Sequence, residues 1–181
     1  MDRLLSTGEQ VSMTLLAMAI EARGYKAMSF TGRQAGIETD GMHAKAKIVK
    51  VHNERIMEAL NKGVIAVVAG FQGIDANGDI TTLGRGGSDT TAVAVAHGSG
   101  RRRVRDLTPM WTACTRPTRA CARAPRSSTS SRTTTMLELS SSGAGVLQMR
   151  AVEFARKYDV VIHSRSAFSE PRAPISRRKP T

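Results

Sequence analysis

A glycine-rich segment carries the clearest chemical signal in this 181-residue chain. It spans Gly84–Thr90, reads Gly-Arg-Gly-Gly-Ser-Asp-Thr, and opens onto Thr91–Ala96, whose pattern predicts a helix. Glycines let a backbone approach a ligand closely, and a following helix aims free amides and its positive dipole end at the loop. Arg85 adds a planar guanidinium suited to a carboxylate or phosphate. The segment therefore predicts an anion-binding loop.

A purely structural interpretation of the same residues stays open. Gly84, Gly86 and Gly87 would then make a tight turn, and Ser88 or Asp89 would cap the helix. The segment is not a Walker loop, because no Gly-Lys-Ser/Thr ends it. The loop taken alone does not decide between the two interpretations.

The elements that must position this loop alternate between helix and strand. Ser6 or Thr7 can cap a helix that ends at Gly24, with Glu9 in its first turn. The helix has a broad apolar face made of Val11, Leu15, Leu16, Met18, Ala19 and Ile20.

Further strands and helices follow along the chain. The run 64–70 is apolar without alternation, which is typical of a parallel strand covered on both faces, and Ala76–Gly78 predicts a hairpin turn. We expect strands at 26–30, 44–51 and 160–163, and helices at about 53–61, 136–142 and 150–157. This alternation predicts an α/β layered domain.

The net charge of +12 is concentrated in two segments, 98–135 and 171–181. Without them the chain has 14 basic and 14 acidic residues, so its remainder is neutral. A phosphate-binding protein more often spreads its basic residues over a folded face, so nucleic acid is not the expected partner. Cys114 and Cys121 lack the spacing and partners of a zinc site, and no metal site is predicted.

Segment 98–135 contains almost no aliphatic residues and cannot offset the cost of ordering its backbone, so we expect weak structure there. No apolar run approaches the roughly 18 residues that a membrane span needs, and the polar start does not resemble a secretory signal. These patterns predict a cytoplasmic protein without a membrane partner.

Several motifs, in order and at similar spacing, resemble the catalytic domain of bacterial aspartokinases. They lie at Leu5–Gln10, Gly24–Ala27, Phe30–Ile37, Val68–Gly73, Ile80–Ala92, Met136–Leu139, Gly143–Ala144, Val146–Gln148 and Ala151–Tyr158. The resemblance covers roughly three quarters of the chain. It implies a three-layer α/β/α amino-acid-kinase fold with a mostly parallel sheet, here incomplete. It also implies phosphorylation of the side-chain carboxylate of L-aspartate by ATP with Mg²⁺, the first step toward lysine, threonine and methionine.

The resemblance also implies roles for individual residues. Glu9 resembles the acid that meets the α-ammonium group of the substrate, and Arg85 the guanidinium that holds its carboxylate. Asp89 resembles the catalytic aspartate that organises the family's lysines. The substrate loop corresponds to Gly86, Gly87 and Ser88. His43, His52, His97 and His163 match no family role and are interpreted as surface or core residues.

The nucleotide side departs from the family pattern. The resemblance implies that Gly145 stands at a position where the family has a lysine. The family's Lys-Phe-Gly-Gly-Thr-Ser segment lies upstream of the residues matched here. Positioned cations stabilise the moving phosphoryl group. We therefore expect this chain to be an inactive or impaired fragment of an aspartate kinase, possessing the aspartate half of the site.

Segment 98–135 also departs from the family and reads as a stretch translated out of frame. Met110-Trp111-Thr112 requires the codons ATG TGG ACN, and a frame starting at the last base of the Met codon gives Val-Asp, the family residues at this point. Codon degeneracy permits the rest of the family string in the same frame. The sequence therefore predicts two compensating frameshifts around this segment.

The sequence predicts four regions: an amino-acid-kinase core at 1–97, the aberrant segment at 98–135, the C-terminal part of the kinase domain at 136–170, and a disordered basic tail at 171–181.

Two other functions remain open. One is polyanion or nucleic-acid binding through Arg101–Arg105 and the tail, which a steep salt dependence would reveal. The other is a noncatalytic partner of intact kinase subunits, or a homo-oligomer.

Overall fold

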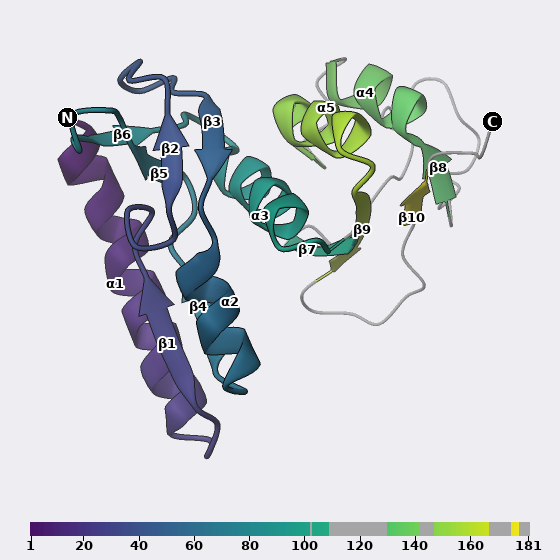
Figure 1. Ribbon diagram of the computed structural model, residues 1–181. Coiled ribbons are helices and arrows are strands. Elements are labelled where there is room, and N and C mark those ends of the chain that lie inside the picture. Colours follow the sequence, from purple (N-terminus) through teal and green to yellow (C-terminus); the bar gives the residue numbers. More distant parts are fainter. Residues whose placement is uncertain (102, 109–129, 142–146, 167–174, 178–181) are drawn as a thin grey trace. The chain divides into compact units, whose positions relative to one another are not determined.

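The computed structural model describes residues 1–101, 103–108, 130–141, 147–166 and 175–177. The chain divides into two compact units, Met1–Ser99 and Gly100–Thr181. Helices and strands alternate along it (Figure 1). Of the seven strand pairings in the described residues, four are parallel and three antiparallel. The predicted mixed α/β class with mostly parallel pairing is confirmed.

The first helix, α1, spans Asp2–Glu21 and begins earlier than predicted. Ser6 lies inside it, where its Oγ donates to the carbonyl of Arg3 at 2.8 Å, so neither Ser6 nor Thr7 is the cap. Glu9 consequently lies about two turns into the helix, and its predicted first-turn place is wrong. The early start has a tertiary cause, because the carboxylate of Asp2 has partners on distant segments.

The face of α1 that packs is not the predicted apolar one. Its buried residues are Asp2, Ser6, Met13 and Ala17. Val11 is 58% exposed and Leu15 60% exposed, so the apolar face is not covered by the described part of the chain. Helical spacing groups the apolar residues on one side of the helix, but only the packing shows which side is buried.

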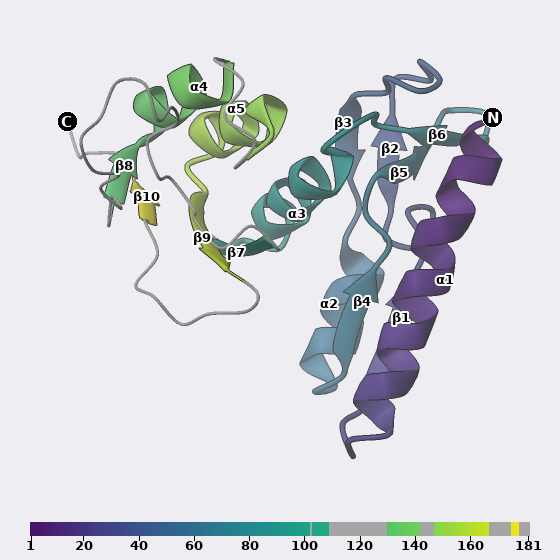
Figure 2. The same cartoon turned by 180° about the vertical axis from the view of Figure 1, so that it is seen from behind.

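A parallel pair of strands follows, β1 (Ala27–Phe30) and β4 (Ile65–Val68), with Phe30 opposite Val68. Helix α1 covers one face of this pair and α2 (Glu54–Asn61) the other (Figures 1 and 2). The predicted parallel strand is confirmed, although Ile65 is 42% exposed rather than buried. The core of this unit gathers Phe30, Ala35, Ile37, Ile56 and Ala59.

A second sheet has the order β3-β2-β5-β6. Its strands are β2 (Ile37–Thr39), β3 (Ile48–Val51), β5 (Gln72–Ile74) and β6 (Ile80–Thr82). The predicted turn at 76–78 joins the antiparallel strands β5 and β6, as expected. The strand predicted at 44–51 is shorter, because Asp40 accepts the backbone N–H of Lys47 and holds that segment as a loop. Strand β2 was not predicted.

The second unit contains a sheet with the order β7-β9-β10-β8. Its elements are β7 (Arg103–Thr108), β8 (Ser130–Arg132), α4 (Thr133–Ser141), α5 (Met149–Lys157), β9 (Val161–Ser166) and β10 (Ile175–Arg177). Strand β7 pairs with β9 along its whole length, so the expectation of weak structure is wrong for these residues. A short strand likewise replaces the disorder expected at 175–177. Backbone pairing supplied the order that composition did not predict.

Some predictions fall outside the described residues. They concern Met110–Thr112 of the frame-shift hypothesis, Cys114, Cys121 and Gly145. The frame-shift hypothesis stays a prediction. None of the helices in the described ranges combines the length and apolar character needed to cross a bilayer.

Candidate functional site

The glycine-rich loop connects β6 to helix α3, which spans Gly87–Gly98. Gly86 is the N-cap residue in the left-handed conformation, with φ of 75°, and no side chain caps the helix. The cap that the structural interpretation expected from Ser88 or Asp89 is therefore wrong, whereas the tight turn that it expected from the glycines is present. Ser88 is exposed and Asp89 is half-buried, and both lie in the first turn of α3. The first backbone N–H groups of α3 therefore have no side-chain cap, which is compatible with an anion-binding loop.

Close packing explains why this loop needs glycine. The N–H of Gly87 closes the turn on the carbonyl of Gly84 at 3.0 Å, and a Cβ on Gly87 would lie 2.7 Å from the Cβ of Leu83. A Cβ on Gly70 would lie 3.1 Å from the Cα of Ser88. The loop therefore lies directly against the segment that follows β4, at the carboxyl end of the parallel strand pair. This end of a parallel sheet is the usual place for a ligand site.

Phe71 is a further candidate site residue, which the sequence did not identify individually. Its φ is 68°, a rare value for a large side chain, and such strain concentrates at functional sites. Its N–H donates to Thr91 Oγ1 at 3.2 Å, and its carbonyl accepts from the N–H of Leu83 at 2.9 Å. Thr91 Oγ1 in turn donates to the carbonyl of Gly87 at 2.9 Å. These bonds hold Phe71 against the first turn of α3.

Helix α1 reaches the same end of the sheet from another direction. The Nε2 of Gln10 lies 3.4 Å from Oε1 of Gln72, the residue after Phe71. Gln72 is only 2% exposed, and its Nε2 donates to the carbonyl of Ser6 at 3.2 Å. Glu9, next to Gln10, is half-buried. The structure thus ties the helix that carries Glu9 to the strand that follows Phe71.

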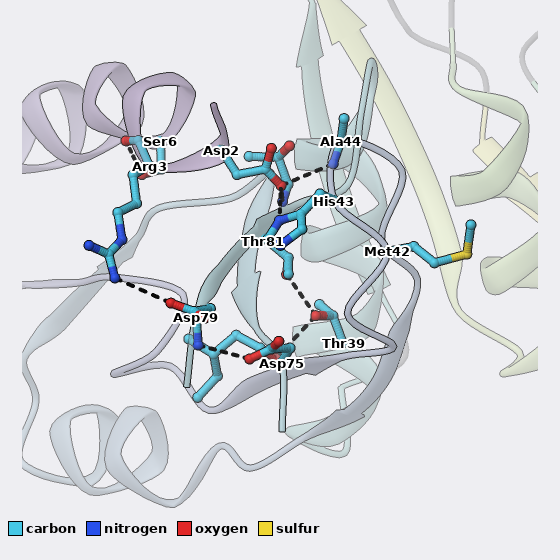
Figure 3. Close-up of polar contacts among 12 residues, drawn as sticks. Asp2, Arg3, Ser6, Thr39, Met42, His43, Ala44, Asp75, Asp79 and Thr81 are labelled. Carbon is cyan, nitrogen blue, oxygen red and sulfur yellow. Dashed lines mark hydrogen bonds and ion pairs between the residues drawn. The ribbon is translucent and has the colours of Figure 1, made fainter. Parts of the chain in front are cut away.

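Asp2 fixes a third segment, which contains His43 and Ala44 (Figure 3). Its Oδ2 accepts the backbone N–H of Ala44 at 3.0 Å and of Thr82 at 2.9 Å, and lies 3.2 Å from His43 Nδ1. Burial alone would raise the pKa of this carboxyl group. The two N–H donors and His43 oppose that effect, and the net result is a lowered pKa. Asp2 is therefore an ionised carboxylate that holds the backbone N–H of Thr82, which lies two residues before Gly84.

The predicted site residues differ in accessibility. Arg85 and Ser88 are exposed, Gly86, Glu9 and Asp89 are half-buried, and Gly87 is buried. The side chains of Arg85 and Ser88 are thus exposed to solvent, whereas the buried residue is Gly87, whose role is steric. Asp2 and Phe71 were missed because their importance depends on contacts between residues far apart in sequence. The signal available for Phe71 was its place between Gly70 and Gly73.

The described residues contain no group of three His, Cys, Asp or Glu side chains that could hold a metal ion. Asp89 lies in the first turn of α3, where its charge is favourable to the helix dipole. The arrangement is suited to a small anion bearing a carboxylate, with Arg85 and the amino-terminal end of α3 as the positive groups.

Fold and site together define a family. The model of the amino acid kinase family matches residues 1–164, and the chain belongs to this family. It is 47% identical to an aspartokinase of Geobacillus stearothermophilus over 178 residues, which is 97% of this chain and 43% of the relative. It is 48% identical to an aspartokinase of Mycolicibacterium smegmatis over 94% of this chain and 40% of the relative. The chain thus spans less than half the length of these relatives.

Solved structures agree with the family. E. coli aspartokinase III in complex with aspartate and ADP matches 99% of this chain and 41% of its own, with a TM-score of 0.87 and 26% identity. Aspartate kinase from Synechocystis matches 100% of this chain and 30% of its own, with a TM-score of 0.83 and 39% identity. The amino-acid-kinase fold inferred from the motifs is confirmed.

Proposed function

We propose that this chain forms the aspartate-binding part of an aspartate kinase, which transfers the γ-phosphoryl group of ATP to the side-chain carboxylate of L-aspartate. The observation that carries the proposal is the near-complete match of the chain to aspartokinases at 47% identity. The tightly packed loop before α3, with Arg85 at its centre, supports it. One relative of similar fold, E. coli aspartokinase III, holds aspartate and ADP in its crystal.

Each predicted residue has a role that its chemistry can perform. The Arg85 guanidinium would bind the substrate carboxylate through two parallel N–H donors. Gly86 and Gly87 would let the backbone approach the substrate, and Ser88, in the first turn of α3, would add a donor at the positive end of the helix dipole. Glu9 would accept from the α-ammonium group. Asp89 would act as the charged organiser of the catalytic cations.

ATP and Mg²⁺ are the co-substrates that the kinase family implies, and ATP supplies the phosphoryl group. The described residues fit the amino acid better than the nucleotide. The loop 84–90 carries one cationic side chain, Arg85, whereas kinases bring lysine and metal-binding carboxylates to the transferred phosphate. The family lysine position, Gly145, lies outside the described residues. The steps assigned to this chain are therefore binding and orientation of aspartate.

Calorimetric titration of the purified chain with L-aspartate tests the proposal. Arg85→Gln should weaken binding by roughly tenfold to a hundredfold, because a charge-assisted pair contributes about 1.5–3 kcal/mol. Arg55→Gln is the matched control, since Arg55 is also exposed but lies on α2. Equal affinity in the two variants would contradict the assignment of Arg85.

An ADP-release assay with aspartate and MgATP measures turnover separately. The family resemblance implies that Gly145 occupies the position of a family lysine. Loss of one charge-stabilising group of this kind costs about a hundredfold to a thousandfold in rate. Turnover within tenfold of a full-length aspartokinase would disprove the expectation of an impaired chain.

A further inference from the structure

A pocket lined by several polar side chains lies next in sequence to the proposed aspartate site, through Gln10 and Gln72, and contains none of that site's predicted residues. Its volume is about 270 Å³, and its lining includes Arg3, Gln10, Thr31, Arg33, Gln72 and Gly73. We call it the Arg33 pocket. The size suits a small molecule rather than a nucleotide, since drug-sized ligands occupy roughly 300–1,000 Å³.

Arg33 is the main donor available in this pocket. Its guanidinium has no hydrogen bond or ion pair to any of the residues that the structure describes, and its side chain is exposed. Arg3 contributes a second guanidinium. One of its nitrogens, Nη2, is engaged by Asp79 Oδ1 at 3.2 Å, which leaves its other donors for a ligand (Figure 3). The two guanidinium groups and the carboxylate of Asp79 together have a net charge of one positive unit, which favours binding of a carboxylate.

Hydrogen bonds within its own turn hold Arg33 in place. The turn that carries it, residues 31–36, is closed by the N–H of Ala35 on the carbonyl of Thr31 at 2.8 Å and the N–H of Gly36 on the carbonyl of Arg33 at 3.0 Å. Gln34 Oε1 accepts from the N–H of Thr31 at 2.9 Å. The backbone of Arg33 is thus positioned before any ligand binds, which lowers the entropy cost of binding.

Two amide side chains, those of Gln10 and Gln72, also line the pocket. Gln72, 2% exposed, is bonded to the carbonyl of Ser6 and to Gln10. Gly32 lets the turn of Arg33 approach Gln72, because a Cβ on Gly32 would lie 2.4 Å from the carbonyl oxygen of Gln72. A guanidinium and fixed amides in the lining of one pocket make a site for a charged group with a polar neighbour.

We propose that the Arg33 pocket binds a small organic carboxylate, with the carboxylate on Arg33 and its polar remainder against Gln10 and Gln72. This ligand would bind at a different position from the proposed substrate, L-aspartate. Gln10 and Gln72 are the chain neighbours of Glu9 and Phe71, so occupancy of the pocket alters the surroundings of the aspartate site. The proposal concerns residues that the aspartate site does not use and does not depend on that site's function.

Calorimetric titration with succinate tests this site, with neutral succinamide as the ligand of matched size. Succinate should bind with a Kd of roughly 1 mM, and succinamide at least tenfold more weakly. Arg33→Gln should weaken succinate binding by about tenfold or more. Arg55→Gln should leave it within twofold. In amide NMR spectra, succinate should shift Gly73 and Ile80, which line the pocket.

Three outcomes would overturn the proposal. The first is equal succinate affinity in Arg33→Gln and Arg55→Gln. The second is loss of succinate binding in Arg85→Gln alone, which would assign the ligand to the aspartate site. The third is tighter binding of inorganic phosphate than of succinate, which would overturn the carboxylate class. Melting temperatures of the variants check that folding is unchanged, and because all three arginines are exposed we expect shifts below about 2 °C.

Discussion

The two units of the chain differ in charge and in how their interiors are built. Residues 1–99 contain ten Lys or Arg and ten Asp or Glu, whereas residues 100–181 contain seventeen and five. Every buried polar side chain in the described residues belongs to the first unit, whereas the described interior of the second is apolar. Directional polar contacts hold loops at defined positions, and apolar packing alone does not. Such polar contacts therefore contribute to the described interior of the first unit, which carries the proposed site.

The largest effect is expected where the first unit is packed most tightly. Gly36 has a φ of 68°, and a Cβ there would lie 2.0 Å from the carbonyl oxygen of His52. Gly36→Ala should cost more than about 4 kcal/mol in the free energy of unfolding, because backbone must move. Chemical denaturation measures this loss.

Gly63 provides a matched control for Gly36. Its φ is 71°, but no atom lies within 4 Å of the point that a Cβ would occupy. Gly63→Ala should cost only about 1–2 kcal/mol, the penalty of the left-handed conformation itself. Similar losses in the two variants would show that close packing does not determine the stability of this unit.

An intermediate effect is expected in the apolar interior of the second unit. Val152 on α5 is 1% exposed. Val152→Ala should cost about 2–3 kcal/mol through lost burial and a residual cavity, with no dependence on pH beyond that of the unsubstituted chain. Met149→Ala, at a 40% exposed position on the same helix, should cost less than about 1 kcal/mol. A loss at Met149 equal to that at Val152 would contradict this description of the interior.

The smallest effect, and the one that depends on pH, is expected at Asp2. Burial by itself raises the pKa of its carboxyl group. The N–H donors of Ala44 and Thr82, together with His43, lower this pKa by more than burial raises it, so the net shift is downward. A lowered pKa in the folded state stabilises the fold above the unfolded value of about 3.9, and the contribution is lost as pH falls through the folded pKa. Asp2→Asn should cost about 1.5 kcal/mol at pH 7.

Urea denaturation of this variant at about pH 7 and about pH 3 measures the dependence. The difference from the unsubstituted chain should shrink at the lower pH, because both forms then approach neutrality at this position. Glu21→Gln, an exposed substitution on the same helix, should change stability by less than about 0.5 kcal/mol at either pH. If the stability lost in Asp2→Asn instead grew as the pH fell, the result would contradict stabilisation by an ionised Asp2 carboxylate.

Much of the first unit was predictable because its signals are local. The apolar run at 64–70 gave the parallel strand β4, and the turn at 76–78 joined two strands as expected. Where the prediction failed, a distant contact was the reason. Strand β7 forms from Arg-containing residues because β9 pairs with it. The buried face of α1 depends on what packs against it, which helical spacing does not contain.

The candidate site shows the same division. The sequence by itself determined the glycine loop and the helix after it, since both depend on residue type and spacing along the chain. The roles of Glu9, Arg85 and Ser88 are implied by the family resemblance and stay predictions. Only the tertiary structure decided that Gly86 caps α3, that Phe71 is held at a positive φ, and that Asp2 and Gln72 clamp α1 beside the loop. Asp2 and Thr82 are eighty positions apart, and Gln72 and Ser6 sixty-six. Such contacts form only when the folded core repays the entropy of closing the long loops between them, and no local pattern records that balance.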